Sequence, residues 1–412
     1  MTASALFNTS VMGMSAQTTA LSAVAENISN SSTVGYKEAT TQFQTLLTSF
    51  QGGSDADGGV SASNVVEVTK SGNMTSTTSS TDLAIQGDGF FVVSDTGGNT
   101  FLTRAGSFLP DSTGRLVNSA GYYLMGYSSS VASAPTDPSG LEAVTIPYGK
   151  EIGTASTEGS LTANLPSTAD TINAADLPSA NASTSTYSKK TSVTAYDNLG
   201  NPVTLDVYFS KTSSNSWEMS VFDASTATNG GFPYSSGAIT TQSLTFSATD
   251  GSITGGASAS IAVPNGSTLS LDLSGLTQLG STFSVSNPTI NGNAASPVSS
   301  VSIAKDGTLS YVLGNGKSVS AYKIPLGTVA SPTNLQAQSG NTFAVTKESG
   351  AAYLGDANSG TMGAIGSDQL EGSTVDLATQ LSNMIVAQRS FSANSQVFQV
   401  ASELMQVLNN LK

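Results

Sequence analysis

The sequence predicts a mixed fold: long N- and C-terminal α-helices that form a coiled coil, with two mainly antiparallel β domains nested discontinuously between them. Three observations predict it. Apolar residues recur every seven positions near both ends of the 412-residue chain, as in coiled-coil helices. The middle of the chain alternates apolar and polar residues, which is typical of strands. The 41 glycines of the whole chain include the turn residues that antiparallel strands need.

The N-terminal helix is predicted over residues 5–28. Phe7, Met14, Leu21 and Ile28 lie seven residues apart on one face. The heptad pattern then ends, and Gly35 is the expected C-terminal stop. Glu26, Lys37 and Glu38 are the only ionised side chains in the first 47 residues. The outer face of this helix therefore suits packing against further copies of the same helices.

Residues 42–60 are predicted to be irregular, with a flexible glycine-rich loop at 52–59. The fragment around Asp55 and Asp57 resembles the start of a calcium-binding loop. It lacks the glycine at the sixth position and the glutamate at the twelfth that such a loop requires. We therefore predict no metal site here, and none elsewhere in the chain.

Strands are predicted from about residue 65 onward, where the period of the apolar residues changes from helical to alternating. The first are 83–85, 90–93, 101–103 and 122–125. A hairpin follows at 190–209, and Trp217 with Val221 and Phe222 forms the next strand and the core of an inserted domain. Later strands are expected at 244–246, 261–263, 269–273, 299–303, 306–312, 322–326 and 341–346.

These elements divide the chain into three predicted domains. A terminal helical domain combines 1–70 with 358–412 and includes an irregular connecting segment. A discontinuous β domain combines 71–150 with 286–357, and an outer β domain is inserted at 151–285.

The C-terminal helix is predicted to start at the segment Ser373–Asp376 and to run from Asp376 to Leu411. Ser373 and Asp376 have the spacing of a capping box, which satisfies the first free N–H groups of a helix. An apolar stripe then runs along the helix, and Arg389 is the only cation before Lys412 in this region. The stripe comprises Leu377, Leu381, Met384, Ile385, Phe391, Phe398, Leu404, Met405, Leu408 and Leu411.

We expect the apolar stripes of both helices to form contacts between subunits. A two-helix hairpin that merely closes one globular domain is the alternative. The residues predicted to carry subunit contacts are Leu6, Phe7, Met14, Leu21, Ile28, Leu377, Leu381, Met384, Phe391, Phe398 and Met405.

The composition argues against several classes of function. Charged residues make up 10% of the chain and the net charge is -14, which disfavours nucleic acid and anionic membranes as partners. There is no Cys and no His, so the usual acid–base, triad and zinc chemistry is missing. No cofactor is expected. No apolar stretch is long enough for membrane insertion, and the N-terminus lacks a signal-peptide pattern.

The N-terminal residues resemble the opening pattern of the rod and hook family, the axial proteins of the bacterial flagellum. The matching positions are Ala5-Leu6, Gly13-Met14, Leu21, Ala25, Asn27-Ile28-Ser29-Asn30, Thr33 and Gly35-Tyr36-Lys37. Ser29 and Tyr36 depart mildly from the commoner Ala and Phe. Residues 82–93, 103–108 and 111–127 resemble a block shared within the family, and 340–394 resembles its closing pattern.

The hairpin at 196–209 is similar to that of the hook members of the family. The resemblance implies an exported, extracellular subunit that assembles with many copies of itself into a flexible curved tube. This tube joins rod to filament and transmits motor torque. The implied partners are the distal rod protein, the hook–filament junction protein, the hook cap scaffold and the flagellar type III export apparatus.

Other functions compete with this interpretation. Within the family, the chain could be a distal rod or another axial protein, although the central insert disfavours that. A β-rich extracellular adhesin would need a signal or anchor. A glycoside hydrolase would need a pair of carboxylates, and no such pair is evident. We therefore predict that the chain is not an enzyme.

Overall fold

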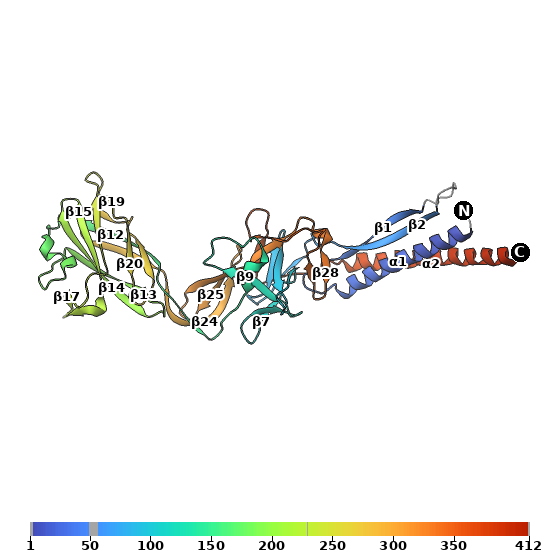
Figure 1. Ribbon diagram of the computed structural model, residues 1–412, viewed down its shortest axis with the longest axis horizontal. Helices are drawn as coiled ribbons and strands as arrows, with labels where there is room; N and C mark the ends of the chain where they lie inside the picture. The colour runs from blue at the N-terminus through green and yellow to red at the C-terminus, as the bar shows by residue number, and fades with distance from the viewer. Residues whose placement is uncertain (1–2, 49–56, 229, 411–412) are drawn as a thin grey trace. The chain divides into compact units, whose positions relative to one another are not determined.

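The computed structural model (Figure 1) describes residues 3–48, 57–228 and 230–410. It is mostly β-sheet, with one α-helix near each end of the chain. The described chain divides into two compact units. Unit 1 comprises Met1–Pro147, Ser300–Val312 and Ser318–Lys412, and unit 2 comprises Tyr148–Ser299 and Leu313–Lys317. The division into three nested domains remains a prediction.

The two α-helices are α1 (Ala3–Ser29) and α2 (Leu377–Asn410), and both belong to unit 1. α2 begins at Leu377, one residue after the predicted start at Asp376. The Asp376 carboxylate caps the helix by accepting from the backbone N–H of Thr379 at 2.8 Å. Ser373 instead accepts from the N–H of Val375 in a short turn at 3.3 Å. Gly35 is not the helix stop, because α1 has already ended at Ser29.

Residues 39–48 and 57–66 form two paired strands, so the prediction of an irregular segment at 42–60 is wrong for its described residues. β1 (Ala39–Thr48) pairs antiparallel with β2 (Asp57–Val66). The Thr9 hydroxyl of α1 donates to the carbonyl oxygen of Gly58 at 2.8 Å, which places the hairpin beside α1. The connection at 49–56, including Asp55 and most of the predicted loop, lies outside the described residues.

Strands from both halves of the chain build unit 1. From the first half they are β3 (Met74–Ser76), β4 (Leu83–Gln86), β5 (Phe90–Ser94), β6 (Thr100–Thr103), β7 (Phe108–Pro110), β8 (Leu116–Asn118), β9 (Tyr123–Ser128) and β10 (Glu142–Ala143). From the second half they are β25 (Thr308–Leu313), β26 (Ser318–Lys323), β27 (Pro325–Thr328), β28 (Gln336–Gln338), β29 (Thr342–Ala344), β30 (Tyr353–Asp356), β31 (Ala364–Ser367) and β32 (Gln369–Glu371).

These strands interleave in one sheet order, β25-β26-β9-β5-β6-β29-β28. The pairs β26–β9, β27–β5 and β29–β6 each join the two halves of the chain. Two smaller pairs, β3–β32 and β31–β4, bring the segment before α2 onto the same unit. The predicted strand at 322–326 is in fact two strands, β26 and β27, with buried Ile324 between them.

Unit 2 contains most of the remaining strands. They are β11 (Glu151–Thr154), β12 (Glu158–Pro166), β13 (Lys189–Tyr196), β14 (Pro202–Ser213), β15 (Ser216–Asp223), β16 (Ala227–Thr228), β17 (Gly231–Tyr234), β18 (Thr240–Phe246), β19 (Ile253–Gly255), β20 (Ser258–Ala262), β21 (Thr268–Asp272), β22 (Thr277–Leu279), β23 (Ser284–Ile290) and β24 (Asn293–Ile303), whose residues divide between the units. Short 3-10 helices lie at 174–176, 178–180 and 224–226 in unit 2, and at 138–140 and 332–334 in unit 1.

Two sheets of unit 2, β20-β21-β12-β22 and β13-β14-β15-β18-β19, share one apolar core. Trp217 is buried in it, and its indole N–H donates to the Gln278 side chain at 2.9 Å. The predicted hairpin at 190–209 is confirmed as β13–β14. Phe222 packs in a separate cluster with Tyr208 and Tyr234. The pairing is mainly antiparallel, although β12 runs parallel to β21 and β22.

Candidate subunit-assembly site

α1 and α2 lie side by side in opposite directions. The rings of Phe7 and Phe398 have centroids 4.6 Å apart near the end of the pair that carries the chain termini. Farther along, a Cβ placed on Gly13 would come within 2.8 Å of the Asn394 side chain, so the helices touch closely there. We call this contact between α1 and α2 the seam. Small residues at the seam permit the short distance between the helices.

The seam is built largely from residues that the sequence analysis did not select. Gly13 and Asn394 approach each other there, and the almost fully buried Asn27 and Gln380 are hydrogen-bonded across it. At about 100° per residue, the buried Ala387 and Ala401 lie on the same face of α2 as Gln380 and Asn394. A signal for them exists, because residues 380, 387, 394 and 401 form a second series with a spacing of seven. This series is small or polar, and a search for large apolar residues misses it.

The predicted contact residues fall into two groups in the structure. Leu6, Phe7, Met14, Leu21, Ile28, Met384 and Phe398 are partly buried. Leu377, Leu381, Phe391 and Met405 are exposed, by 48%, 51%, 37% and 46% of their surface. Within the chain, Phe7 and Phe398 meet. The side chain of Leu408 is not described, and Leu411 lies outside the described residues. The role of these residues between subunits stays a prediction.

Asn27 holds together the end of the helix pair that lies away from the chain termini, which we call the inner end. Its amide nitrogen donates to the Ala39 carbonyl oxygen at 2.8 Å and to the Gln380 side chain at 3.1 Å. Its amide oxygen accepts from the Ala39 N–H at 2.9 Å and from the Tyr36 hydroxyl at 3.2 Å. One buried amide thus connects α1, β1 and α2 with its hydrogen-bonding capacity well used. This geometry gives Asn27 of the terminal motif a structural role.

Tyr36, which contacts Asn27, has a raised pKa. Burial, together with the charges of Glu26 and Glu38, raises the pKa of its phenol to about 12. Because the folded pKa lies above the ordinary value of 10.0, the unfolded chain loses this proton first. The stabilisation is complete below about pH 10 and is lost as pH rises through about pH 12.

Replacing Tyr36 by phenylalanine should therefore reduce the alkaline loss of stability. Because Tyr36 is partly exposed, we expect a difference on the order of 1 kcal/mol between about pH 9 and about pH 11.5. Urea unfolding followed by helical circular dichroism measures it. The lost hydroxyl contact with Asn27 adds a constant offset at every pH. Tyr353→Phe, at a residue 60% exposed, is the matched control and should keep the native pH dependence. Equal slopes for all three chains would contradict the prediction.

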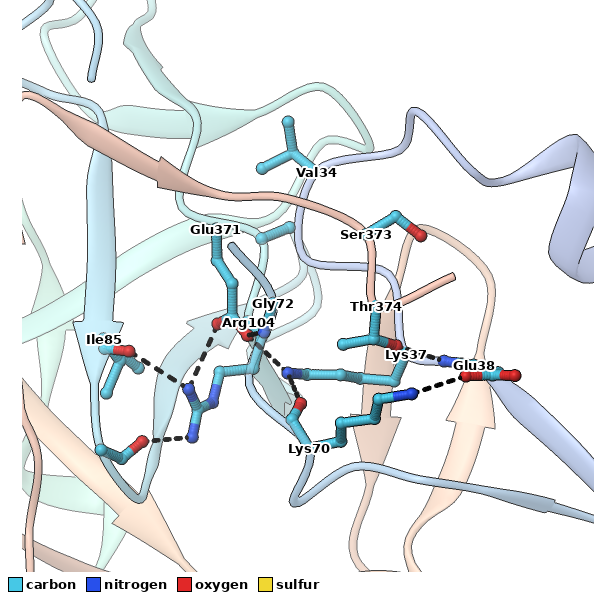
Figure 2. A network of polar contacts seen from close by, with 12 residues as sticks. Val34, Lys37, Glu38, Lys70, Gly72, Ile85, Arg104, Glu371, Ser373 and Thr374 are labelled. Carbon is cyan, nitrogen blue, oxygen red and sulfur yellow. Dashed lines mark hydrogen bonds and ion pairs between the residues drawn. The ribbon is translucent and has the colours of Figure 1, made fainter. Parts of the chain in front are cut away.

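A buried ion cluster lies next to the inner end of the helix pair (Figure 2). One oxygen of the Glu371 carboxylate contacts the Lys37 ammonium at 2.6 Å, and the other contacts the Arg104 guanidinium at 3.2 Å. The backbone N–H of Gly72 also donates to this carboxylate, at 2.8 Å. All three charged side chains are at most 3% exposed. Arg104 is thus a structural ion-pair partner.

The cluster gathers segments that are far apart in sequence. Lys37 follows α1, Arg104 follows β6, and Glu371 ends β32 just before α2. Burial lowers the pKa of Lys37, and the bond to Glu371 opposes that effect. The Lys37 ammonium also donates to the Lys70 carbonyl oxygen at 2.5 Å. The cluster therefore joins the residues flanking both helices to the β-sheet part of unit 1.

A second ion pair extends this connection to the first turn of α2. The Lys70 ammonium contacts Glu38 at 2.9 Å, and the hydrogen bond raises the pKa of Lys70. The Gln380 amide donates to the other oxygen of Glu38 at 2.6 Å. Thr374 accepts from the Glu38 backbone N–H at 2.9 Å. Polar contacts thus hold the inner ends of both helices, whereas apolar contacts join their outer parts.

The described residues also bear on metal binding and on membrane-spanning helices. They contain no group of three or more acidic side chains placed to hold a metal ion. No helix among them is long and apolar enough to cross a membrane. The arrangement is suited to holding and presenting two long helices.

Comparison with known proteins supplies the context. Four family models match the chain. Residues 7–37 match the model described as flagella basal body rod protein, and residues 84–163 match flagellar hook protein FlgE/F/G D1 domain. Residues 164–293 match flagellar basal body protein FlaE D2 domain, and residues 367–411 match flagellar basal body rod FlgEFG protein C-terminal. The flagellar hook protein FlgE of Brucella suis is 42% identical over 409 residues, which cover 99% of this chain and 98% of that protein. The chain belongs to the flagellar hook protein family.

A more distant hook protein, FlgE of Salmonella typhimurium, is 32% identical over 416 aligned residues, covering 98% of this chain and all of that protein. The crystal structure of Helicobacter pylori flagellar hook protein FlgE2 aligns with a TM-score of 0.47 and 14% identity, over 71% of this chain and 98% of that chain. The sequence relatives carry the family assignment. As a flagellar hook protein, the chain is a structural subunit of the exported, extracellular hook and not an enzyme.

Proposed function

We propose that the chain assembles with many copies of itself into a flexible curved tube, which joins the rod to the filament and transmits torque as a universal joint. α1 and α2 pack as a coiled coil with the helices of neighbouring copies and form the inner tube. The β domains, nested within the chain, form the outer shells. Such an assembly is an open helical polymer built from heterologous contacts.

The observation that supports this proposal is the number of exposed apolar side chains on α2. Among the described large apolar side chains of α2, ten are at least 37% exposed: Leu377, Leu381, Ile385, Val386, Phe391, Val397, Val400, Leu404, Met405 and Val407. Isolated soluble proteins rarely leave so many apolar side chains of one helix in water. Burial against further copies removes it from water at about 25 cal/mol per Å². The proposed contact residues Leu377, Leu381, Phe391 and Met405 belong to this surface.

The mechanical argument follows from bending. A curved tube that rotates about its own axis must compress its inner side and extend its outer side once per revolution. Interlocked apolar helices hold the inner tube together, and polar outer surfaces with modest contacts permit sliding. We further propose that the ends of the tube meet a distal rod protein and a hook–filament junction protein. Assembly would use a hook cap scaffold and the type III export apparatus.

Replacing Phe391 by serine tests assembly directly. The variant should give a folded, soluble monomer that does not polymerise, because an exposed polar residue replaces an apolar contact between copies. Electron microscopy of flagella from cells carrying the variant measures hook number and length, and circular dichroism of the purified chain checks folding. Leu109→Ser changes an apolar residue that is 65% exposed on β7, away from the helices, and should leave hooks unchanged. Normal hooks from Phe391→Ser would refute the proposal.

A further inference from the structure

Eight of the ten exposed large apolar side chains of α2 form two separate groups, and the other two, Phe391 and Met405, lie nearer the seam at about 100° per residue. The leucine flank consists of Leu377, Leu381 and Ile385, in the first third of the helix. The valine flank consists of Val386, Val397, Val400, Leu404 and Val407, which lie mostly in its second half. At about 100° per residue, each flank lies roughly 120° from the seam, on opposite sides of the helix.

A polar strip separates the two flanks on the side away from α1. It contains Arg389, Gln396 and Glu403, all exposed and each roughly opposite the seam at about 100° per residue. Arg389 and Glu403 are the only charged side chains between Leu377 and Val407. α2 therefore has four faces: a seam to α1, two uncharged apolar flanks and a charged strip. The charged strip suits water, whereas the flanks suit apolar partners.

We propose that the leucine flank of one copy packs against the valine flank of the next, as the two halves of a single staggered contact. This inference rests on the proposed polymer. In an open helical assembly each copy is related to the next by one rotation and translation, so the contacting surfaces are different. Flanks on opposite sides of one helix fit that requirement. The charged strip, flanked by neighbours on both sides, then faces the water in the tube.

The positions of the flanks along α2 set the stagger. The leucine flank is centred on Leu381, and the valine flank is centred near residue 399. About 18 residues separate these centres, or roughly 27 Å at about 1.5 Å per residue. Neighbouring copies that match one flank to the other are therefore displaced along the helix by about this length. The displacement favours a helical polymer over a flat ring.

Cysteine cross-linking tests the contact, because the native chain contains no Cys. Three full-length chains carry Leu381→Cys together with Val397→Cys, Val400→Cys or Leu404→Cys, and their isolated hooks are treated with a short bis-maleimide. At least one pair should give a denaturing-gel ladder of dimers, trimers and longer chains. Leu381→Cys with Gln396→Cys, on the charged strip, is the matched control and should give no ladder.

The outcomes separate this inference from the proposed function. Hooks that assemble but give no ladder with any of the three pairs overturn the staggered contact and leave the polymer intact. Dimers from Leu381→Cys alone or Val400→Cys alone would show that like flanks meet, which also overturns it. Absence of the native chain from hooks would instead refute the proposed function.

If the cysteine variants do not assemble into hooks, charged substitutions test the same contact. Leu381→Lys and Val400→Glu should each abolish hooks, because each places a charge in an apolar contact. Combined in one chain, the two changes place opposite charges across the contact and should restore hooks at least in part. Failure of the double variant to restore any assembly would overturn the inference.

Discussion

Replacing Glu371 by glutamine should destabilise unit 1 by about 3 kcal/mol or more. The change leaves Lys37 and Arg104 buried without the carboxylate that compensates both charges, and both side chains are nearly inaccessible to water. Removing one member of a buried ion cluster costs far more than removing an exposed pair. Urea unfolding followed by helical circular dichroism reports on unit 1, because the α-helices among the described residues, α1 and α2, both belong to it.

Two further chains show whether the loss comes from the cluster. Glu348→Gln makes the same change at an exposed position of unit 1 and should alter stability by less than about 0.5 kcal/mol. Lys37→Met combined with Glu371→Gln should cost less than the sum of the two changes, because a single cation then remains. A loss below about 1 kcal/mol for Glu371→Gln would show that the cluster does not hold the unit together.

Periodicity in the sequence was sufficient to predict both helices and most strands, because apolar residues recur at helical or alternating spacing even where, as in α2, many of them are exposed. The hairpin β1–β2 escaped prediction for a physical reason. The face of β1 with Gln42, Gln44 and Leu46 carries mostly polar residues, and the strand opposite contributes Ser63, Ser61 and Gly59. A close backbone approach at Gly59, where a Cβ would meet the sulfur of Met12, replaces side-chain packing. The apolar alternation on the other face, with Phe43 on β1 and with Val60 and Ala62 on β2, is too short to identify a strand in the sequence.

The ion cluster could not be predicted because its members are remote in sequence. Lys37 and Glu371 lie 334 residues apart, and each looks like an ordinary surface charge when read locally. The resemblance to the flagellar family included both residues in matching blocks but assigned them no role. Only the pairing of β3 with β32 brings Glu371 beside the segment that follows the hairpin.

The candidate assembly surface was predicted in part. The heptad pattern placed Leu377, Leu381 and Phe398 on one broad stripe. In the structure Phe398 packs against Phe7 at the seam, whereas Leu377 and Leu381 face outward on the leucine flank. The predicted stripe covered more of the surface of α2 than one contact occupies. It includes residues of the seam as well as residues of the leucine flank. Val386, Val400 and Val407 were missed because their own seven-residue series is out of phase with that of the large residues.

Replacing Gly35 by alanine should destabilise unit 1 by about 3 kcal/mol and detach the helix pair from its anchor. Gly35 has a φ of +67°, and a Cβ there would lie 2.6 Å from backbone atoms of Arg104 and Ala105. Its N–H donates to the Glu371 carbonyl oxygen at 2.7 Å, so a shift of this loop also disturbs the ion cluster.

Gly98→Ala is the control that separates the strain of a positive φ from the close contact of the added Cβ. Gly98 has a φ of +86° but open space around it. That control should cost only about 1 kcal/mol, as measured by urea unfolding of both chains. Equal losses would mean that backbone strain alone explains Gly35, and that the close contact with Arg104 and Ala105 contributes nothing.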